Sequence, residues 1–169
     1  LEFRRVLFRS MLDLNNLEKY REDNRIEAKE AVGGLPHSIW ETYSAFANTL
    51  GGVILLGVAE AEDKTLYSLD LDVPEKLITE FWDIINNTDY VSKNILSEDD
   101  VQIRRADGNR IIVIRVPKAE ENDIPVYIGK DVYHGTYIRC GEGDYRCSPE
   151  QVKTMTEKNT YSDKRGIYG

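Results

Sequence analysis

The spacing of apolar residues along the chain predicts its main helices and strands. Between residues 38 and 50, apolar side chains recur at three- and four-residue steps. This predicts an amphipathic helix whose buried face comprises Ile39, Trp40, Tyr43, Phe46, Ala47 and Leu50. Ser38 and Glu41 match a capping box at its start, and Gly51-Gly52 can end it. Residues 53–59 then form an apolar run typical of a central strand buried on both faces. A helix that leads into such a strand indicates an α/β fold.

A shorter alternating pattern precedes this helix. In residues 25–30, Ile26 and Ala28 would share one face of a strand, while Glu27 and Lys29 would share the other. We therefore expect Glu27 and Lys29 to point the same way. Ahead of this strand, the apolar spacing in residues 11–21 predicts a short first helix.

The middle of the chain shows a second helix and a hairpin. Pro74 suits a first helical position, and the apolar spacing after it predicts a helix that ends near Asn86. Two β-rich runs in residues 101–116 flank Asp107-Gly108, which tolerates the positive φ angles of a tight hairpin turn.

The last part of the chain predicts shorter elements. An exposed acidic loop at residues 117–125 is followed by short strands expected at residues 126–128 and 136–139. Ser148 and Gln151 match a capping box, so a last helix is expected from there to about Lys158.

Length and composition favour one soluble domain. A chain of 169 residues with 41% hydrophobic residues can bury a core. No apolar stretch approaches the roughly 18 residues of a membrane helix. Residues 1–10 carry three arginines and lack the pattern of a secretory signal, so we interpret them as a leader foreign to the fold. Residues 11–158 would form the domain, and residues 159–169 a frayed tail or linker.

The net charge limits the partners that the domain can attract. The formal charge is −8, and it falls to −10 without the leader, whose three arginines and one glutamate contribute +2. An acidic domain has no general attraction for nucleic acid. Binding to DNA or RNA would therefore require a local basic patch or metal ions.

The cysteines and histidines do not form a recognisable site. Cys140 and Cys147 make no disulfide framework, and without an export signal we expect the reducing cytoplasm. Together with His134 they could suggest zinc, but the cysteine spacing differs from that of usual ligand pairs. We prefer two buried structural thiols, and we expect His37 at the surface. The sequence contains neither a phosphate-binding loop nor a dinucleotide fingerprint.

Acidic residues offer the main candidate chemistry. Glu27 lies on the first predicted strand, Glu22 precedes it, and Glu60 follows the predicted central strand. Carboxylates at strand ends can bind Mg²⁺ or Mn²⁺ for phosphodiester hydrolysis. Lys29 could then neutralise charge that develops on the phosphate. In a chain with 30 acidic residues, ordinary surface positions are the competing interpretation.

Residues 44–58, SAFANTLGGVILLGV, resemble the signature of the Schlafen-type AlbA domain. This is a family of predicted DNA-binding modules once grouped with divergent AAA ATPases. Two further stretches agree: Glu22-x-x-x-x-Glu27-Ala28-Lys29 resembles the family's E-x-x-x-x-E-F-K, and Tyr137-x-Arg139-x-Gly141 resembles its Y-x-R-x-G. The matches run in the expected order from about residue 22 to residue 152.

The resemblance implies an α/β (α+β) single domain with a mixed central sheet flanked by helices. Bacterial members often form the N-terminal part of longer proteins similar to transcriptional regulators, so we expect this chain to be a fragment. Animal relatives include RNA-cleaving nucleases whose three-carboxylate metal site maps onto Glu22, Glu27 and Glu60. Glu60 departs from the pattern because Ala59-Glu60 stands where the family commonly has Asp-Asp, which changes the reach of the ligand.

Three functional hypotheses follow. The first is a DNA- or RNA-binding module whose candidate contacts are basic residues near predicted strands: Lys29, Arg104, Arg105, Arg115 and Arg139. The second is a nuclease that uses Mg²⁺ or Mn²⁺ with Glu22, Glu27, Glu60 and Lys29. The third is a non-catalytic association domain, such as a homo-oligomer, which the acidic charge favours. Asn48 and Thr49 are expected to be architectural.

Overall fold

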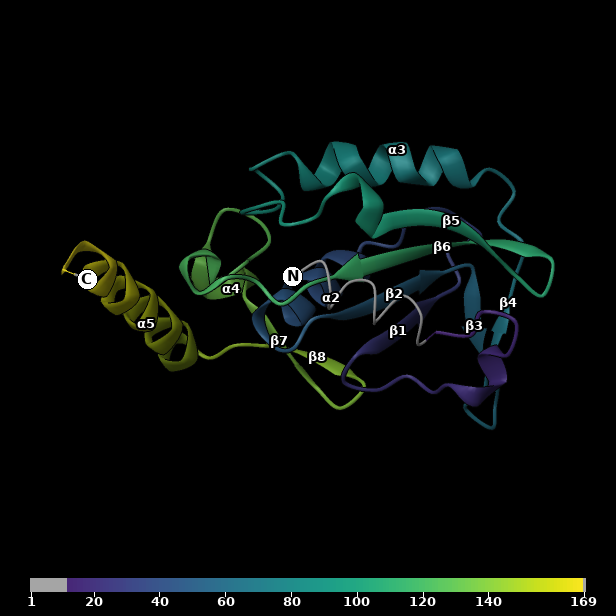
Figure 1. The fold of residues 1–169 in the computed structure, drawn as a ribbon, viewed down its shortest axis with the longest axis horizontal. Coiled ribbons are helices and arrows are strands. Elements are labelled where there is room, and N and C mark those ends of the chain that lie inside the picture. The colour runs from purple at the N-terminus through teal and green to yellow at the C-terminus, as the bar shows by residue number, and fades with distance from the viewer. Residues whose placement is uncertain (1–11, 169) are drawn as a thin grey trace.

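The computed structural model describes residues 12–168, with side chains described through residue 158. Its centre is a mixed four-stranded sheet with the order β1-β2-β6-β5 (Figure 1). Strand β1 (Ile26–Lys29) runs parallel to β2 (Gly52–Leu56), and β2 pairs antiparallel with β6 (Asn109–Val116). Strand β5 (Val101–Ala106) completes the sheet antiparallel to β6. The chain is a single α+β domain, as expected.

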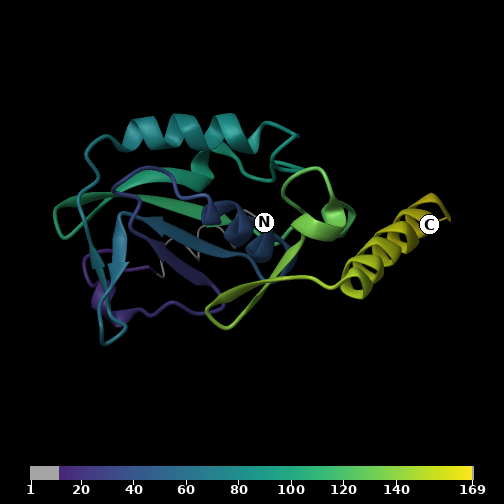
Figure 2. The same cartoon turned by 180° about the vertical axis from the view of Figure 1, so that it is seen from behind.

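Two helices cover one face of this sheet (Figures 1 and 2). They are α2 (Ser38–Asn48) and α3 (Pro74–Ile85), and both predicted helices are therefore confirmed. The period-two alternation of β2 and β6 sends every second side chain toward the helices. The main core forms there from α2, α3 and the sheet, and its largest members include Ile39, Tyr43, Phe46, Phe81, Ile54 and Ile112.

Residues 12–168 cover the opposite face only in part. A smaller core joins the N-terminal segment, which contains the 3₁₀ helix η1 (Leu17–Lys19), to the hairpin of β3 (Val58–Glu60) and β4 (Leu66–Ser68). Both cores meet across β2, whose five residues are all buried. The predicted central strand was thus correctly placed between two packed faces, whereas Ile103, Arg104 and Arg105 in the middle of β5 are exposed.

The predicted continuous strand at residues 53–59 was wrong. Gly57 has a φ of +85°, and a Cβ at this position would lie 2.8 Å from the Leu71 side chain. The glycine therefore bends the chain out of the main sheet, so that β2 ends at Leu56 and β3 pairs with β4 instead. Glu60 consequently lies at the end of a strand in a second sheet.

The C-terminal part adds short elements beside α2. Strand β7 (Tyr137–Cys140) pairs with β8 (Gly143–Arg146), after the one-turn helix α4 (Val132–Gly135). Helix α5 (Pro149–Tyr168) projects from the body (Figure 1). Its capping box is confirmed, because Ser148 and Gln151 exchange backbone-to-side-chain hydrogen bonds of 2.8 and 3.2 Å. Helical backbone continues past Lys158, where a frayed tail was expected.

Several local expectations need correction. Within the predicted first helix only η1 is helical, and residues 1–10, the expected leader, lie outside the described residues. In the strand predicted at residues 126–128, Tyr127 and Ile128 form isolated bridges instead. The predicted capping box at Ser38 does not form, because Ser38 is the first helical residue and His37 takes the N-cap position. Leu50 is 51% exposed, since α2 ends at Asn48 before the helical face can continue.

The predicted hairpin is confirmed. Asp107 and Gly108 have φ angles of 51° and 82°, the positive values that a two-residue turn between β5 and β6 requires. Among residues 12–168, none of the helices has the length and apolar character that a membrane crossing demands.

Asn48 joins α2 to the C-terminal part of the chain. Its side-chain amide donates to the Val126 and Tyr137 carbonyl oxygens over 2.8 and 3.0 Å, and its oxygen accepts from the Val126 N–H over 2.8 Å. Thr49 Oγ1 accepts from the Arg139 N–H over 3.0 Å. The architectural role expected for Asn48 and Thr49 is confirmed, with partners distant in sequence.

Replacing Asn48 with Leu should lower the free energy of unfolding by about 2–4 kcal/mol, because the Val126 N–H and the Tyr137 carbonyl oxygen lose the bonds that Asn48 makes with them. Urea unfolding measures this change. The exposed residue Asn24 provides a control, and Asn24→Ala should change the free energy by no more than about 0.5 kcal/mol. Equal effects of the two substitutions would contradict the role assigned to Asn48.

Candidate functional site

The edge strand β1 carries two of the predicted site residues side by side. Lys29 Nζ lies 3.5 Å from Glu27 Oε1 and donates to Ser38 Oγ over 3.0 Å. The prediction that Glu27 and Lys29 share an orientation is confirmed. Both side chains are largely buried, with 14% and 10% of their surfaces exposed. The Lys29 ammonium therefore already has two partners within the protein, Glu27 and Ser38.

Arg139 is the second partner of Glu27. Its guanidinium lies 2.8 Å from Glu27 Oε2 and 2.8 Å from Asp144 Oδ1, and it also donates to the carbonyl oxygens of Asp23 and Ile26. The group stands 5.0 Å from the centre of the Phe46 ring, and its side chain is completely buried. Arg139 therefore cannot serve as an exposed nucleic-acid contact, and this expectation was wrong.

Three carboxylates meet near the edge of β1. One oxygen each from Glu22, Glu60 and Glu142 lies within 4.8 Å of the others. Glu22 is positioned by the free edge of β1, because its Oε1 accepts from the Ala28 N–H over 3.1 Å. Glu60 comes from the end of β3 and Glu142 from the turn between β7 and β8. The group contains two of the three predicted acids, and Glu142 takes the place expected for Glu27.

The electrostatics of this cluster favour a proton or a cation. Burial, followed by the negative charges of Glu27 and Glu60, raises the pKa of Glu22 to about 7. Glu27 thus lies close enough to affect the cluster although Arg139 holds its carboxylate. Lys64 Nζ lies 3.3 Å from Glu60, and its hydrogen bond and attraction to Glu60 raise the pKa of Lys64. The exposed Lys64 ammonium is therefore a counterion that a metal would have to displace.

The other predicted basic residues divide into two groups. Arg115 is nearly buried and donates to Asp100 Oδ1 over 2.8 and 3.2 Å, so it is committed to a structural ion pair rather than exposed as a contact. Arg104 and Arg105 lie exposed on the edge strand β5. Arg105 donates to the Gly108 carbonyl oxygen over 2.9 Å, which fixes it beside the hairpin turn.

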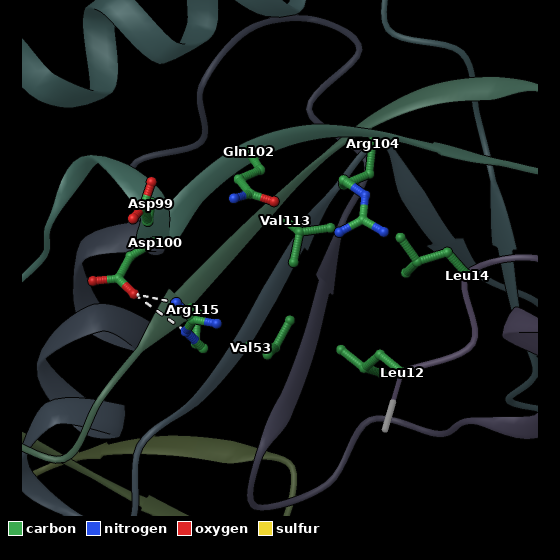
Figure 3. A pocket seen from close by; sticks show the side chains of 9 residues that line it. All are labelled: Leu12, Leu14, Val53, Asp99, Asp100, Gln102, Arg104, Val113 and Arg115. Carbon is green, nitrogen blue, oxygen red and sulfur yellow. Dashed lines mark hydrogen bonds and ion pairs between the residues drawn. The ribbon is translucent and has the colours of Figure 1, made fainter. Parts of the chain in front are cut away.

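A hollow lies on the partly covered face of the sheet. Its floor contains Val53 and Val113, and Arg104 extends over this floor from β5 (Figure 3). Asp100 and Arg115 lie at one end of the hollow, joined by their ion pair, while Leu12 and Leu14 lie at the other. This hollow combines an apolar surface with a long cationic side chain. Sequence analysis identified Arg104 but not the hollow, because its parts come from four separate segments.

The cysteine and histidine expectations are only partly met. Cys147 is buried, and burial raises the pKa of its thiol, but Cys140 is exposed, so the prediction of two buried thiols was wrong for Cys140. His134 pairs with Asp131. Within the described residues, the three-ligand cluster of glutamates is not joined by His134 or either cysteine. His37 is exposed, as expected.

Comparison with known proteins identifies the family. The family described as Schlafen, AlbA_2 matches residues 22–148, which include β1, the acidic cluster and β7. The chain belongs to this family. The Schlafen AlbA_2 match contains both Asn48 and Arg139, whose contacts join α2 to β7. No curated protein matched the sequence.

Two solved structures are similar to this Schlafen AlbA_2 domain. One is the N-terminal domain of a Nitrosomonas europaea protein described as a "Putative ATP-dependent DNA Helicase RecG-related Protein". It has 28% sequence identity and a TM-score of 0.56, over 79% of this chain and 90% of that one. The other is the DIP2311 protein from Corynebacterium diphtheriae, with 17% identity and a TM-score of 0.57. The match covers 90% of this chain but 28% of that one, and it shows the fold alone.

The raised pKa of Glu22 predicts a pH-dependent stability of this Schlafen AlbA_2 domain. In the unfolded state Glu22 loses its proton above its ordinary pKa of 4.5, whereas in the folded state it keeps the proton up to about pH 7. The stability of the folded state therefore falls as the pH rises from about 4.5 to about 7. Glu22→Gln removes this loss and keeps an oxygen that can accept from Ala28. Glu22→Gln should stabilise the domain at pH 8 by about 1 kcal/mol, after a discount for solvent screening. This gain corresponds to a rise in Tm of about 2–4 °C.

Scanning calorimetry at pH 8 and pH 5 measures the effect. At pH 5, where Glu22 is mostly protonated in the folded state, the gain should shrink. Glu80→Gln, an exposed change on α3, serves as the control and should leave Tm unchanged at both pH values. A gain for Glu22→Gln that is larger at pH 5 than at pH 8 would contradict the assignment.

Proposed function

We propose that this domain binds nucleic acid, with DNA as the first candidate, through the partly covered face of its central sheet. The observation that carries the proposal is the position of Arg104, an exposed cationic side chain above an apolar floor. Phosphates supply most of the affinity of such complexes, and apolar surface can contact bases or sugars. Membership of the Schlafen AlbA_2 family and the similarity to a domain of a helicase-related protein support the same function.

The charge distribution would direct nucleic acid to this face. The chain has a net charge of −8, and Glu22, Glu60 and Glu142 concentrate negative charge near the edge of β1. Strand β5 lies at the opposite edge of the sheet, where Arg104 and Arg105 are exposed. Repulsion at one edge and attraction at the other would orient a phosphate backbone. A role within a longer regulator, as the family resemblance implies, would use this module to hold DNA.

Arg104→Ala should weaken DNA binding about tenfold, the loss of roughly 1.4 kcal/mol expected for one charge-assisted contact. The salt dependence of log K should also become shallower by about one unit of slope, because one phosphate contact is removed. Fluorescence anisotropy with a labelled oligonucleotide at several salt concentrations measures both quantities.

Lys130→Ala provides the matched control. Lys130 is exposed and lies 3.6 Å from Asp89, and it belongs to a turn outside the hollow. It should leave affinity and salt slope unchanged. Equal effects of the two substitutions would show only a general dependence on net charge, and unchanged binding by Arg104→Ala would remove this face from the proposal.

A second candidate function is metal-dependent cleavage of the bound strand, which the acidic cluster favours. Its donor set consists of carboxylate oxygens, which suit Mg²⁺ or Mn²⁺. Burial and then the charges of Glu27 and Glu60 raise the pKa of Glu22 to about 7, and a bound cation would offset that repulsion. Glu22, Glu60 and Glu142 would hold the ion, which would supply charge stabilisation to the phosphate. Glu27 would act through the cluster's electrostatics, because Arg139 occupies its carboxylate.

For this second candidate, Mn²⁺ should raise the Tm of the domain, since an ion that binds only the folded state stabilises it. Mn²⁺ should also support cleavage of labelled RNA or DNA. Glu60→Gln should abolish both effects, whereas Glu80→Gln, which lies on α3 outside the cluster, should retain them. The absence of a Tm shift and of cleavage at millimolar Mn²⁺ would exclude the metal-dependent function while leaving DNA binding open.

A further inference from the structure

A pocket of about 550 Å³ lies on the helical side of the sheet, away from both the hollow and the acidic cluster. It opens between the first turn of α2, the end of α3 and two loops. The residues that line it include Trp40, Glu41, Ile84, Tyr90 and Ile128. Its size falls within the range of about 300–1,000 Å³ that small-molecule sites occupy. The lining is mostly apolar, with a few polar groups at one side.

The aromatic part of the pocket consists of Trp40 and Tyr90. Trp40 is 7% exposed and stacks on Phe81 at 4.9 Å between ring centres, with 21° between the ring planes. Tyr90 is 59% exposed, yet its backbone is fixed at both ends. Its N–H donates to the Asn87 carbonyl oxygen over 2.9 Å, and its carbonyl oxygen accepts from the Gly129 N–H over 2.8 Å. Packing therefore fixes the Trp40 ring, and the Tyr90 ring extends from an ordered backbone.

The polar part presents a donor beside an acceptor. Ser38 and Glu41 lie three residues apart on α2, and therefore on the same side of the helix. Ser38 Oγ accepts from the Lys29 ammonium, so its hydroxyl hydrogen points elsewhere and can donate to a ligand. Glu41 Oε1 accepts a long bond of 3.4 Å from the Tyr137 hydroxyl, and a carboxylate can accept several more.

We infer that this pocket binds a purine base. A purine edge presents an N–H donor next to an acceptor, which complements Glu41 and Ser38, while its two fused rings offer the area to contact Tyr90 and Trp40. The carboxylate of Glu41, which lines the pocket, disfavours a phosphate beside it. The base could belong to a free nucleotide or to an unstacked residue of a bound strand, since both present the same edge.

Tryptophan fluorescence of the intact chain tests this inference. The chain has two tryptophans, so Trp82→Phe leaves Trp40, in the pocket, as the reporter. Guanosine and adenosine monophosphates should change the Trp40 fluorescence until the site is saturated. Cytidine and uridine monophosphates should bind at least tenfold more weakly. In a second titration, oligonucleotides of equal length with and without purines are added, and the same Trp40 fluorescence is measured. Saturation by free purine nucleotides, or only by purine-containing strands, supports the inference and identifies the source of the base.

Glu41→Gln in the Trp82→Phe background should weaken purine binding at least tenfold, because the amide replaces an acceptor with a donor. Glu80→Gln, on α3 outside the pocket, is the matched control. Unchanged Tm establishes that both variants are folded. Arg104→Ala should leave free-nucleotide binding intact, which separates this site from the proposed DNA-binding face. The inference is overturned if neither nucleotides nor strands change the Trp40 signal at millimolar concentration, if pyrimidines bind equally, or if Glu41→Gln has no effect.

Discussion

The architecture depends on a buried cluster of four charges around Arg139. The guanidinium contacts Glu27 and Asp144 at 2.8 Å each, and Lys29 lies 3.5 Å from Glu27, so two cations and two anions neutralise one another. Burial alone would lower the pKa of Arg139, but the Asp144 hydrogen bond and the Glu27 charge together raise it, which keeps the group ionised. A buried charge without partners would cost several kcal/mol, so each member constrains the positions of the others. The cluster thereby joins β1, α2 and the β7–β8 hairpin.

This constraint explains why the family motifs occur where they do. The acid and lysine of β1 and the arginine of β7 are distant in sequence but belong to one ion-pair cluster. Asn48 and Thr49 act beside it, because they bind the backbone of residues 126 and 137 and the Arg139 N–H. In this chain, the most recognisable positions of the motif therefore hold the second half of the domain against the first. Candidate ligand contacts lie elsewhere, at residues with fewer internal partners.

The local elements were predictable because their signals are local. Asp107-Gly108 specifies a hairpin through its own backbone preference, and Pro74 begins a helix through its fixed φ. The shared orientation of Glu27 and Lys29 follows from strand periodicity. The bend at Gly57 was not predictable from the apolar pattern, because the apolar run continues through this residue, while the bend depends on its left-handed φ and on the nearby Leu71. A period-two pattern does not reveal such a change of sheet.

The candidate sites were harder to predict because each depends on the tertiary arrangement. Glu142 joins Glu22 and Glu60 only because the β7–β8 turn reaches the edge of β1, and its sequence context resembles any exposed turn. Arg115 and Arg139 looked like exposed basic residues until Asp100 and Glu27 were found beside them. Charge counting cannot distinguish a paired arginine from a free one.

The pairing of Glu27 with Arg139 also determines the character of the neighbouring acidic cluster. Burial raises the pKa of Glu22 first, and the charge of Glu27 raises it further although Arg139 and Lys29 pair with Glu27. Had Arg139 stood among Glu22, Glu60 and Glu142 instead, their mutual repulsion would be balanced and no cation would be required. The buried cation Arg139 thus pairs with Glu27 and does not lie among the three carboxylates of Glu22, Glu60 and Glu142. That separation neutralises the buried charges and leaves three carboxylates close together at the acidic edge, while Arg104 and Arg105 remain exposed on β5 at the opposite edge.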